Sequence, residues 1–127
     1  MNNMPSSFHL YRAGEFGERP WGQWRVLDVQ PNVVVKKLYL NPKGRISLQR
    51  HKYRTERWIV ISGTATVRRG DEISQLSVGE SVLIPCGSLH RLSNETCEPL
   101  CLIEIQLGEL LSEEDIERFT DDYGRVN

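Results

Sequence analysis

Short apolar or alternating runs, separated by turn residues, make up the middle of the chain. Each run has the length of a typical strand, and several are rich in β-branched residues. The runs cover residues 33–40, 45–49, 58–61, 64–68, 72–76, 81–84 and 100–105. No helical period lies between them. The pattern therefore predicts an all-β sandwich or barrel.

Turn residues mark the ends of these runs. The stretch Asn41-Pro42-Lys43-Gly44 interrupts the chain between two of them, and Pro85 ends the run at 81–84. Gly70-Asp71 lies between two strand-like runs, which predicts a β-hairpin.

The two ends of the chain follow a different pattern. Residues 1–18 are polar and contain glycine, so we expect an irregular N-terminal arm. In the tail, Ser112 has the character of an N-cap, acidic residues follow it, and an amphipathic stretch comes next. A short C-terminal helix is therefore expected over 112–120. The 127 residues suit one domain, so a single domain is expected over 1–127.

Composition narrows the range of partners and compartments. The chain has 16 Lys and Arg against 17 Asp and Glu, a net charge of −1, so bulk charge does not favour nucleic acid or an anionic membrane. No run reaches the roughly 18 apolar residues that span a bilayer, and no signal-peptide pattern is present. The cysteines, Cys86, Cys97 and Cys101, form no CxxC pair and are expected to be structural. We expect a cytoplasmic protein without a nucleic-acid or membrane partner.

Residues of metal-ligating type are concentrated in the segment 44–63. Gln49 and His51 are two positions apart, so on one strand they point to the same face. Glu56 follows after four intervening residues, enough for the chain to turn and present a carboxylate to the same place. An amide oxygen, an imidazole and a carboxylate together suit a borderline or hard divalent ion.

A second segment, 79–94, adds a fourth candidate ligand. Pro85 and Gly87 form a tight turn, after which His90 enters the next strand. A single histidine on a strand is more often a surface or core residue than a ligand, and Glu56 between two arginines also fits a solvated ion-pair face. The combined spacing, rather than any one residue, favours a metal site.

These two segments resemble the two sequence motifs of the cupin superfamily. In the first, Glu56 is followed by six residues and then Gly63, as the motif requires; Gln49 stands where a histidine is usual, and Gly44 is one residue nearer than usual. The second motif matches at every step, with Gly79, Pro85, Gly87, His90 and Asn94.

The resemblance implies the cupin double-stranded β-helix, a jelly-roll barrel. Its interior would hold one divalent metal ion on Gln49, His51, Glu56 and His90. Zn, Mn, Co, Ni and Fe are not distinguished by these ligand types.

Within the cupins, the chain is most similar to the type II mannose-6-phosphate isomerases. These often form the C-terminal domain of bifunctional mannose-1-phosphate guanylyltransferase/mannose-6-phosphate isomerases. The resemblance covers about residues 19 to 125 and rests on Arg19-Pro20-Trp21-Gly22, Ser47-Leu48-Gln49-x-His51, Arg54-x-Glu56-x-Trp58, Val60-x-Ser62-Gly63-Thr64-Ala65, His90-Arg91 and the tail from Asp115 to Arg125. Glutamine is also common at the first ligand position of that family. These 127 residues lack the Gly-rich nucleotide-binding segment, so nucleotidyl transfer is not expected.

This resemblance implies metal-dependent interconversion of mannose 6-phosphate and fructose 6-phosphate through an enediol. Glu56 is the leading candidate for the proton-transferring group, Tyr53 is a weaker one, and Arg54 would bind phosphate or a sugar hydroxyl through its planar fork. If residues 45–51 form one regular strand, the side chains at 45, 47, 49 and 51 share a face, which predicts that Arg45 points toward the cavity that holds the ligands. The candidate substrate-binding residues are Lys43, Arg45, Arg54 and Arg91.

Two other functions are weighed against the isomerase. The family usually has histidines where this chain has Tyr53 and Arg57, so a non-catalytic sugar- or sugar-phosphate-binding cupin is the alternative. An iron-dependent dioxygenase is disfavoured, because such cupins favour three histidine ligands and His9 lies in the expected arm. We also expect a homodimer, by analogy with cupins that cover a sheet edge by pairing subunits.

Overall fold

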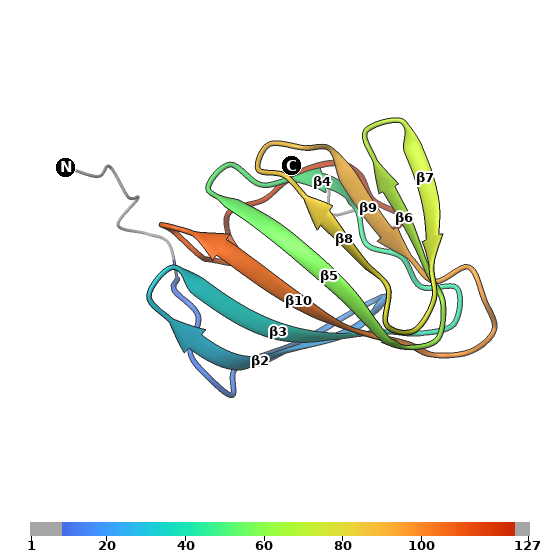
Figure 1. Cartoon of the computed structure of the whole chain (residues 1–127), viewed down its shortest axis with the longest axis horizontal. Helices are drawn as coiled ribbons and strands as arrows, with labels where there is room; N and C mark the ends of the chain where they lie inside the picture. Colours follow the sequence, from blue (N-terminus) through green and yellow to red (C-terminus); the bar gives the residue numbers. More distant parts are fainter. Residues whose placement is uncertain (1–8, 124–127) are drawn as a thin grey trace.

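The computed structural model describes residues 9–123, which form eleven strands and no helix. All paired strands are antiparallel. The first sheet has the order β1 (Phe16–Arg19), β2 (Gly22–Gln30), β3 (Val33–Leu40), β10 (Leu100–Gly108), β5 (Arg54–Ser62), β8 (Ser81–Ile84). The second has the order β11 (Glu117–Thr120), β4 (Leu48–Arg50), β9 (His90–Ser93), β6 (Ala65–Arg69), β7 (Glu72–Leu76). Figure 1 shows the long strands β2, β3, β10 and β5 side by side along one wall, with the shorter strands β4, β9, β6 and β7 forming the other.

The inward face of the first sheet changes from apolar to polar along its strands. Toward one end, alternate residues such as Leu38 on β3, Leu102 on β10 and Val60 on β5 form the hydrophobic core. Two residues further along the same face of these strands, the inward positions are occupied by Lys36 on β3 and Glu104 on β10, both buried. A buried charge is costly unless it is paired and hydrogen-bonded. The polar part of the interior is therefore where a functional site is expected.

The glycine that ends β5 has a steric role. Gly63 has a φ of 86°, in the left-handed region that favours glycine. A Cβ at this position would lie 2.5 Å from the carbonyl oxygen of Pro99. The closing glycine of the first motif thus permits a close approach between the end of β5 and the chain that leads into β10.

Most of the predicted strands are confirmed. Residues 33–40, 72–76 and 81–84 are strands with the predicted bounds, and Gly70-Asp71 connects β6 and β7 as a hairpin. The run at 58–61 lies within the longer strand β5, and the run at 100–105 within β10. Beyond the predicted run, β5 includes the buried charged residues Arg54 and Glu56, and β10 includes the buried polar residue Gln106.

The N-terminal arm is only partly confirmed. Residues 9–15 are irregular, but β1 pairs with β2 in a hairpin, so the prediction of an irregular arm is wrong from Phe16 onward. Residues 1–8 lie outside the part of the chain that the structure describes, as does Arg125 of the family-like tail.

The predicted helix over 112–120 is wrong. Residues from Ser112 to Ile116 form a turn, and β11 then pairs with the edge of β4. Asp115 accepts backbone hydrogen bonds from Lys52 (2.9 Å) and Tyr53 (3.0 Å) with its carboxylate. The Asp115 carboxylate thus binds a neighbouring loop, and the β4 edge supplies the backbone partners that a helix would have found within itself. A search of residues 9–123 for a helix capable of spanning a membrane finds none.

Candidate metal centre

Three adjoining segments bring the predicted metal ligands together. Gln49 on β4 lies directly opposite His90 on β9, His51 follows β4, and Glu56 faces inward from β5. One ligand atom from each of His51, Glu56 and His90 falls within 4.8 Å of the others, and all three residues are buried. Gln49 lines the same cavity as Glu56. The structure thus assembles the residues that the motif spacing predicted.

Hydrogen bonds to the backbone orient both imidazole rings. His51 Nδ1 lies 2.7 Å from the carbonyl oxygen of Asp115, and His90 Nδ1 lies 2.9 Å from that of Ser88. A carbonyl oxygen only accepts, so each Nδ1 donates its proton, and in the neutral ring the lone pair is then on Nε2. His90 Nε2 is buried and has no hydrogen-bond partner within residues 9–123. This is the arrangement in which histidine binds a metal ion.

The side chain of Gln49, the fourth candidate metal ligand, is also oriented by hydrogen bonds. Gln49 Nε2 donates to the hydroxyl oxygen of Ser47 at 3.0 Å and to its carbonyl oxygen at 3.3 Å. The amide nitrogen is thereby occupied, which leaves the amide oxygen as the donor atom for a cation. Two imidazole nitrogens, one carboxylate and one amide oxygen fit a divalent transition metal or zinc.

Arg54 holds the carboxylate of Glu56 in place. Its Nε donates to Glu56 Oε2 at 2.7 Å, its Nη1 donates to the carbonyl oxygen of Ser112 at 2.8 Å, and its Nη2 lies 3.4 Å from His51 Nε2. The guanidinium is thus bound to the protein at all three nitrogens, which makes Arg54 a positioning residue. The structure does not present it as the free phosphate ligand that the sequence predicted.

The charges around the ligand set keep it in the metal-binding protonation state. Burial raises the pKa of Glu56, but the positive charge of Arg54 outweighs this effect and holds that pKa below its ordinary value. Burial, followed by the charge of Arg54, lowers the pKa of His51 well below 6.5. Near neutral pH Glu56 is therefore a carboxylate and His51 a neutral imidazole.

A second buried carboxylate, Glu104, lies next to the ligand set. Trp58 Nε1 bridges the two acids, at 2.9 Å from Glu56 Oε1 and 3.2 Å from Glu104 Oε1. Glu104 Oε2 accepts a hydrogen bond from Gln106 at 2.7 Å and lies 3.7 Å from Lys36 Nζ. Burial, followed by the charge of Glu56, raises the pKa of Glu104. The two carboxylates are thus driven toward opposite protonation states.

Glu104 and Lys36 were not predicted as site residues, although the sequence carries a signal for both. Each is a charged residue inside a run that is otherwise mostly apolar, 100–105 and 33–40. Each also belongs to the set of alternate strand positions whose side chains face the interior. A charge on the buried face of a strand marks an interior polar site.

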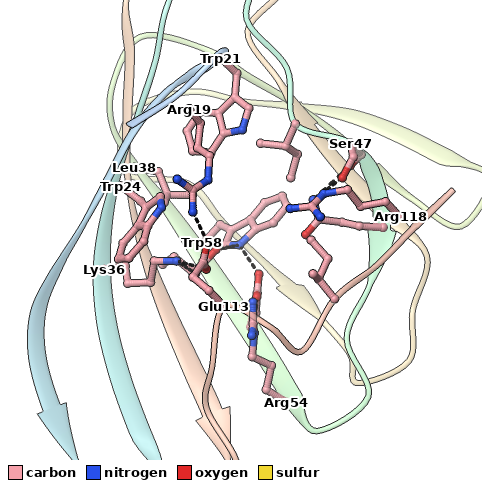
Figure 2. Close-up of a pocket in the computed structure, with 15 residues that line it drawn as sticks. Arg19, Trp21, Trp24, Lys36, Leu38, Ser47, Arg54, Trp58, Glu113 and Arg118 are labelled. Carbon is pink, nitrogen blue, oxygen red and sulfur yellow. Dashed lines mark hydrogen bonds and ion pairs between the residues drawn. The ribbon is translucent and has the colours of Figure 1, made fainter. Parts of the chain in front are cut away.

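Two of the candidate ligands, Gln49 and Glu56, line a cavity inside the barrel. Figure 2 shows Lys36 and Trp24 on one side of it, Ser47 and Arg118 on the other, and Trp58 between them. Trp21 also lines this cavity, and Trp58, which lines it as well, is fully buried. Its cationic lining residues are Arg19, Lys36, Arg54 and Arg118.

Three of the four predicted substrate-binding residues lie elsewhere. Arg45 forms an ion pair with Asp122, and it lines a groove together with Arg91 that is separate from the cavity. Lys43 donates its ammonium proton to the carbonyl oxygen of Glu95 at 2.7 Å. The prediction that Arg45 points into the cavity is wrong because β4 begins only at Leu48, so strand alternation does not extend back to residue 45.

The two residues that replace family histidines also lie outside the cavity. Tyr53 is in the loop between β4 and β5 and lines a different depression, next to His51. Arg57 is exposed on the outer face of β5, with Nη1 3.4 Å from the hydroxyl of Ser81. Neither Tyr53 nor Arg57 lines the wall on which Glu56 and Glu104 lie.

Glu113 connects the C-terminal segment to the cavity wall. It lies 3.0 Å from Lys36 Nζ and 3.5 Å from Arg19 Nη2, and it accepts a hydrogen bond from the hydroxyl of Tyr11. Burial raises the pKa of Glu113, but the charge of Lys36 and these hydrogen bonds outweigh it and lower the pKa to about 2.

The contribution of Glu113 to stability should therefore depend on pH. A carboxylate whose folded pKa is lowered from 4.5 to about 2 stabilises the fold above pH 4.5, and this stabilisation is lost as the pH falls toward 2. We expect Glu113→Gln to unfold at lower urea concentration than wild type at pH 6, with the difference shrinking at pH 3. The exposed Glu72→Gln is the control. A difference that is the same at both pH values would contradict the assignment.

The two-sheet barrel and its inward-facing His/Glu/His set define a cupin. A cupin-2 domain protein from Rhodospirillum rubrum has a similar fold, with a TM-score of 0.67 and 18% sequence identity over 88% of this chain and 86% of that one. The family model described as mannose-6-phosphate isomerase C-terminal matches residues 9–121. The chain belongs to this family.

Two relatives illustrate the context in which this domain occurs. The xanthan biosynthesis protein XanB of Xanthomonas campestris pv. campestris (strain B100) is 49% identical over 108 residues, 85% of this chain and 23% of that protein. The mannose-1-phosphate guanylyltransferase of Escherichia coli (strain K12) is 40% identical over 118 residues, 93% of this chain and 25% of that protein. The chain thus spans about a quarter of the length of these relatives.

Proposed function

We propose that this domain is a metal-dependent isomerase that interconverts mannose 6-phosphate and fructose 6-phosphate. The observation that carries the proposal is the convergence of His51, His90 and Glu56 on one buried point beside a second carboxylate, Glu104. Membership of the isomerase C-terminal family supports this substrate class. The names of the relatives, which refer to xanthan biosynthesis and to mannose 1-phosphate, agree with a role in mannose metabolism.

The donor set would bind one divalent ion through Gln49, His51, Glu56 and His90. Such an ion supplies Lewis-acid polarisation of the sugar carbonyl when bound. The chain's own contribution is to orient both imidazole rings by holding each Nδ1 on a backbone carbonyl oxygen, and to hold the Glu56 carboxylate through Arg54 and Trp58.

Moving a carbonyl between C1 and C2 requires a proton to be carried between these two carbons through an enediol. Glu56 was the first candidate, but Arg54 and Trp58 bind its two oxygens and lower its basicity, which suits a ligand. Glu104 lies in the same cavity, outside the donor set, with its pKa raised. We therefore assign the proton transfer to the Glu104 carboxylate.

The phosphate group requires cations within reach of this cavity. Arg19 at the end of β1 and Arg118 on β11 line it from the two different sheets. A guanidinium can bind a phosphate through two parallel hydrogen bonds. We assign the phosphate of the substrate to Arg19 and Arg118 in place of Lys43, Arg45 and Arg91.

The test is interconversion of mannose 6-phosphate and fructose 6-phosphate by purified protein. It is run on metal-stripped protein and again after Zn, Mn or Co is restored. Turnover that appears only with metal supports the proposal. A folded, metal-loaded protein that binds fructose 6-phosphate in a calorimeter without converting it would instead identify the non-catalytic sugar-phosphate-binding cupin. The homodimer stays a prediction that sedimentation of the same sample would test.

Glu104→Gln is expected to lower kcat by at least about 100-fold, because a carboxamide cannot carry the proton. Metal content, measured by elemental analysis, should stay at the wild-type level, since Glu104 is outside the donor set. Glu109→Gln, an exposed neighbour beyond the end of β10, is the matched control. Wild-type kcat in the Glu104→Gln protein would refute the assignment of the proton transfer to this residue.

A further inference from the structure

A groove on the outer face of the second sheet gathers three arginines away from the metal centre. Arg45, Arg68 and Arg91 line it, together with Thr66, Ser93 and Glu95, and it encloses about 360 Å³. Arg91 and its neighbour His90 point to opposite faces of β9, because successive side chains alternate along a strand. The groove is therefore separated from the metal ligands by the thickness of the sheet.

Two of these arginines face each other without a compensating charge. Arg68 on β6 and Arg91 on β9 are directly opposite in the strand register. Like charges at such positions destabilise a sheet. Within residues 9–123 neither arginine forms an ion pair. Arg68 Nε donates to the carbonyl oxygen of Gly70, Arg91 Nε donates to that of Ile46, and Arg91 Nη2 donates to the carbonyl and hydroxyl oxygens of Thr120 at 3.3 Å. A carbonyl oxygen accepts a hydrogen bond but does not neutralise the guanidinium.

The acidic residues near the groove, including Glu95 in its lining, form no ion pair with Arg68 or Arg91 within residues 9–123. Asp122 is bound to Arg45, so that pair is neutral on balance. Arg68 and Arg91 thus lie opposite each other, and no ion pair within residues 9–123 neutralises either charge.

Two hydroxyls complete a set of hydrogen-bond donors on the floor of the groove. Thr66 and Ser93 are directly opposite in the next row of the same strand pair, and a β-bridge joins Ser93 to Arg45. Neither hydroxyl forms a hydrogen bond with another residue in the described range 9–123. Guanidinium forks next to hydroxyl donors match the oxygens of a tetrahedral oxyanion.

We propose that this groove binds a phosphate group through Arg68 and Arg91, with Thr66 and Ser93 contributing hydroxyl hydrogen bonds. A phosphate dianion offsets both uncompensated charges, whereas a carboxylate offsets one. The site lies outside the metal cavity and does not depend on the isomerase activity.

The primary test measures thermal unfolding in phosphate and in chloride buffers of equal ionic strength. Phosphate should raise the Tm of the wild-type chain, because a ligand that binds only the folded state stabilises it. Arg68→Gln should unfold at a higher temperature than wild type in chloride, since the repulsion is relieved, and its Tm should not respond to phosphate. Arg68 is the residue to change, because within residues 9–123 its side chain forms one hydrogen bond, to the carbonyl oxygen of Gly70.

The matched control is Arg69→Gln, the next residue on β6, which contacts Leu83 and Glu72 outside the groove. It should keep the full phosphate response. By titration calorimetry, the Kd for inorganic phosphate should weaken at least about tenfold in Arg68→Gln and stay unchanged in Arg69→Gln. The proposal would be overturned if phosphate still raised the Tm of Arg68→Gln. It would also be overturned if the Tm of the wild-type chain were no higher in phosphate than in chloride. A parallel titration with ribose 5-phosphate shows whether the groove prefers a phosphate ester or free phosphate. Tighter binding of ribose 5-phosphate than of inorganic phosphate would identify a phosphate ester as the ligand, and weaker binding would identify free phosphate.

Discussion

Replacing His51 with alanine is expected to abolish divalent-metal binding by the purified domain and, with it, sugar-phosphate turnover. The side chain supplies one of three donor atoms that lie within 4.8 Å of each other in a buried site. Loss of an outer partner of a metal ligand costs roughly 10–100-fold in affinity, and loss of the ligand itself should cost more. Metal titration calorimetry and elemental analysis of the dialysed protein measure the effect.

The same variant should lose the stabilisation that metal confers. At a free metal concentration about 100 times Kd, a ligand of the folded state alone stabilises it by about 2.7 kcal/mol. We expect a corresponding rise in Tm when metal is added to stripped wild-type protein, and none in His51→Ala or His90→Ala. His9→Ala, at an exposed histidine, is the control and should respond as wild type does. Unchanged metal affinity in His51→Ala would refute the proposed centre.

Arg54→Met is expected to destabilise the metal-stripped fold by about 3–5 kcal/mol, the range observed when one partner of a buried ion pair is removed. The substitution leaves the Glu56 carboxylate buried without the guanidinium 2.7 Å away. Urea unfolding at pH 7 measures the effect. Arg57→Met, an exposed position on the same strand, should change stability by no more than about 0.5 kcal/mol.

The pH dependence and a second substitution separate this charge effect from simple loss of packing. Because the pKa of Glu56 is lower in the folded than in the unfolded state, the ion pair stabilises the fold at neutral pH, and this is lost as the pH falls through the folded pKa. The deficit of Arg54→Met should therefore shrink in acid. Adding Glu56→Gln should restore part of the lost stability at pH 7. If Glu56→Gln adds its own full cost instead, the effect of Arg54 is not electrostatic.

The sequence by itself determined the barrel and which residues are candidate metal ligands. Strand alternation over 33–40 and 72–76 is a local property, because side chains point to alternate faces whatever the strand packs against. The ligands His51, Glu56 and His90 could be identified for the same reason. Each lies within a few residues, along the chain, of the turn or strand that positions it. The spacing of the motif therefore predicts where its side chain lies in the fold.

The tertiary structure alone decided the conformation of the tail and the locations of the other charged groups. The tail pairs with β4 as β11 because an open sheet edge and the loop at Lys52 and Tyr53 supply its hydrogen bonds. Glu104 meets Glu56 through the register of two strands nearly fifty residues apart in the chain. Arg68 faces Arg91 through a register of the same kind. Local patterns do not encode such contacts, because strand register is set by how the whole sheet packs.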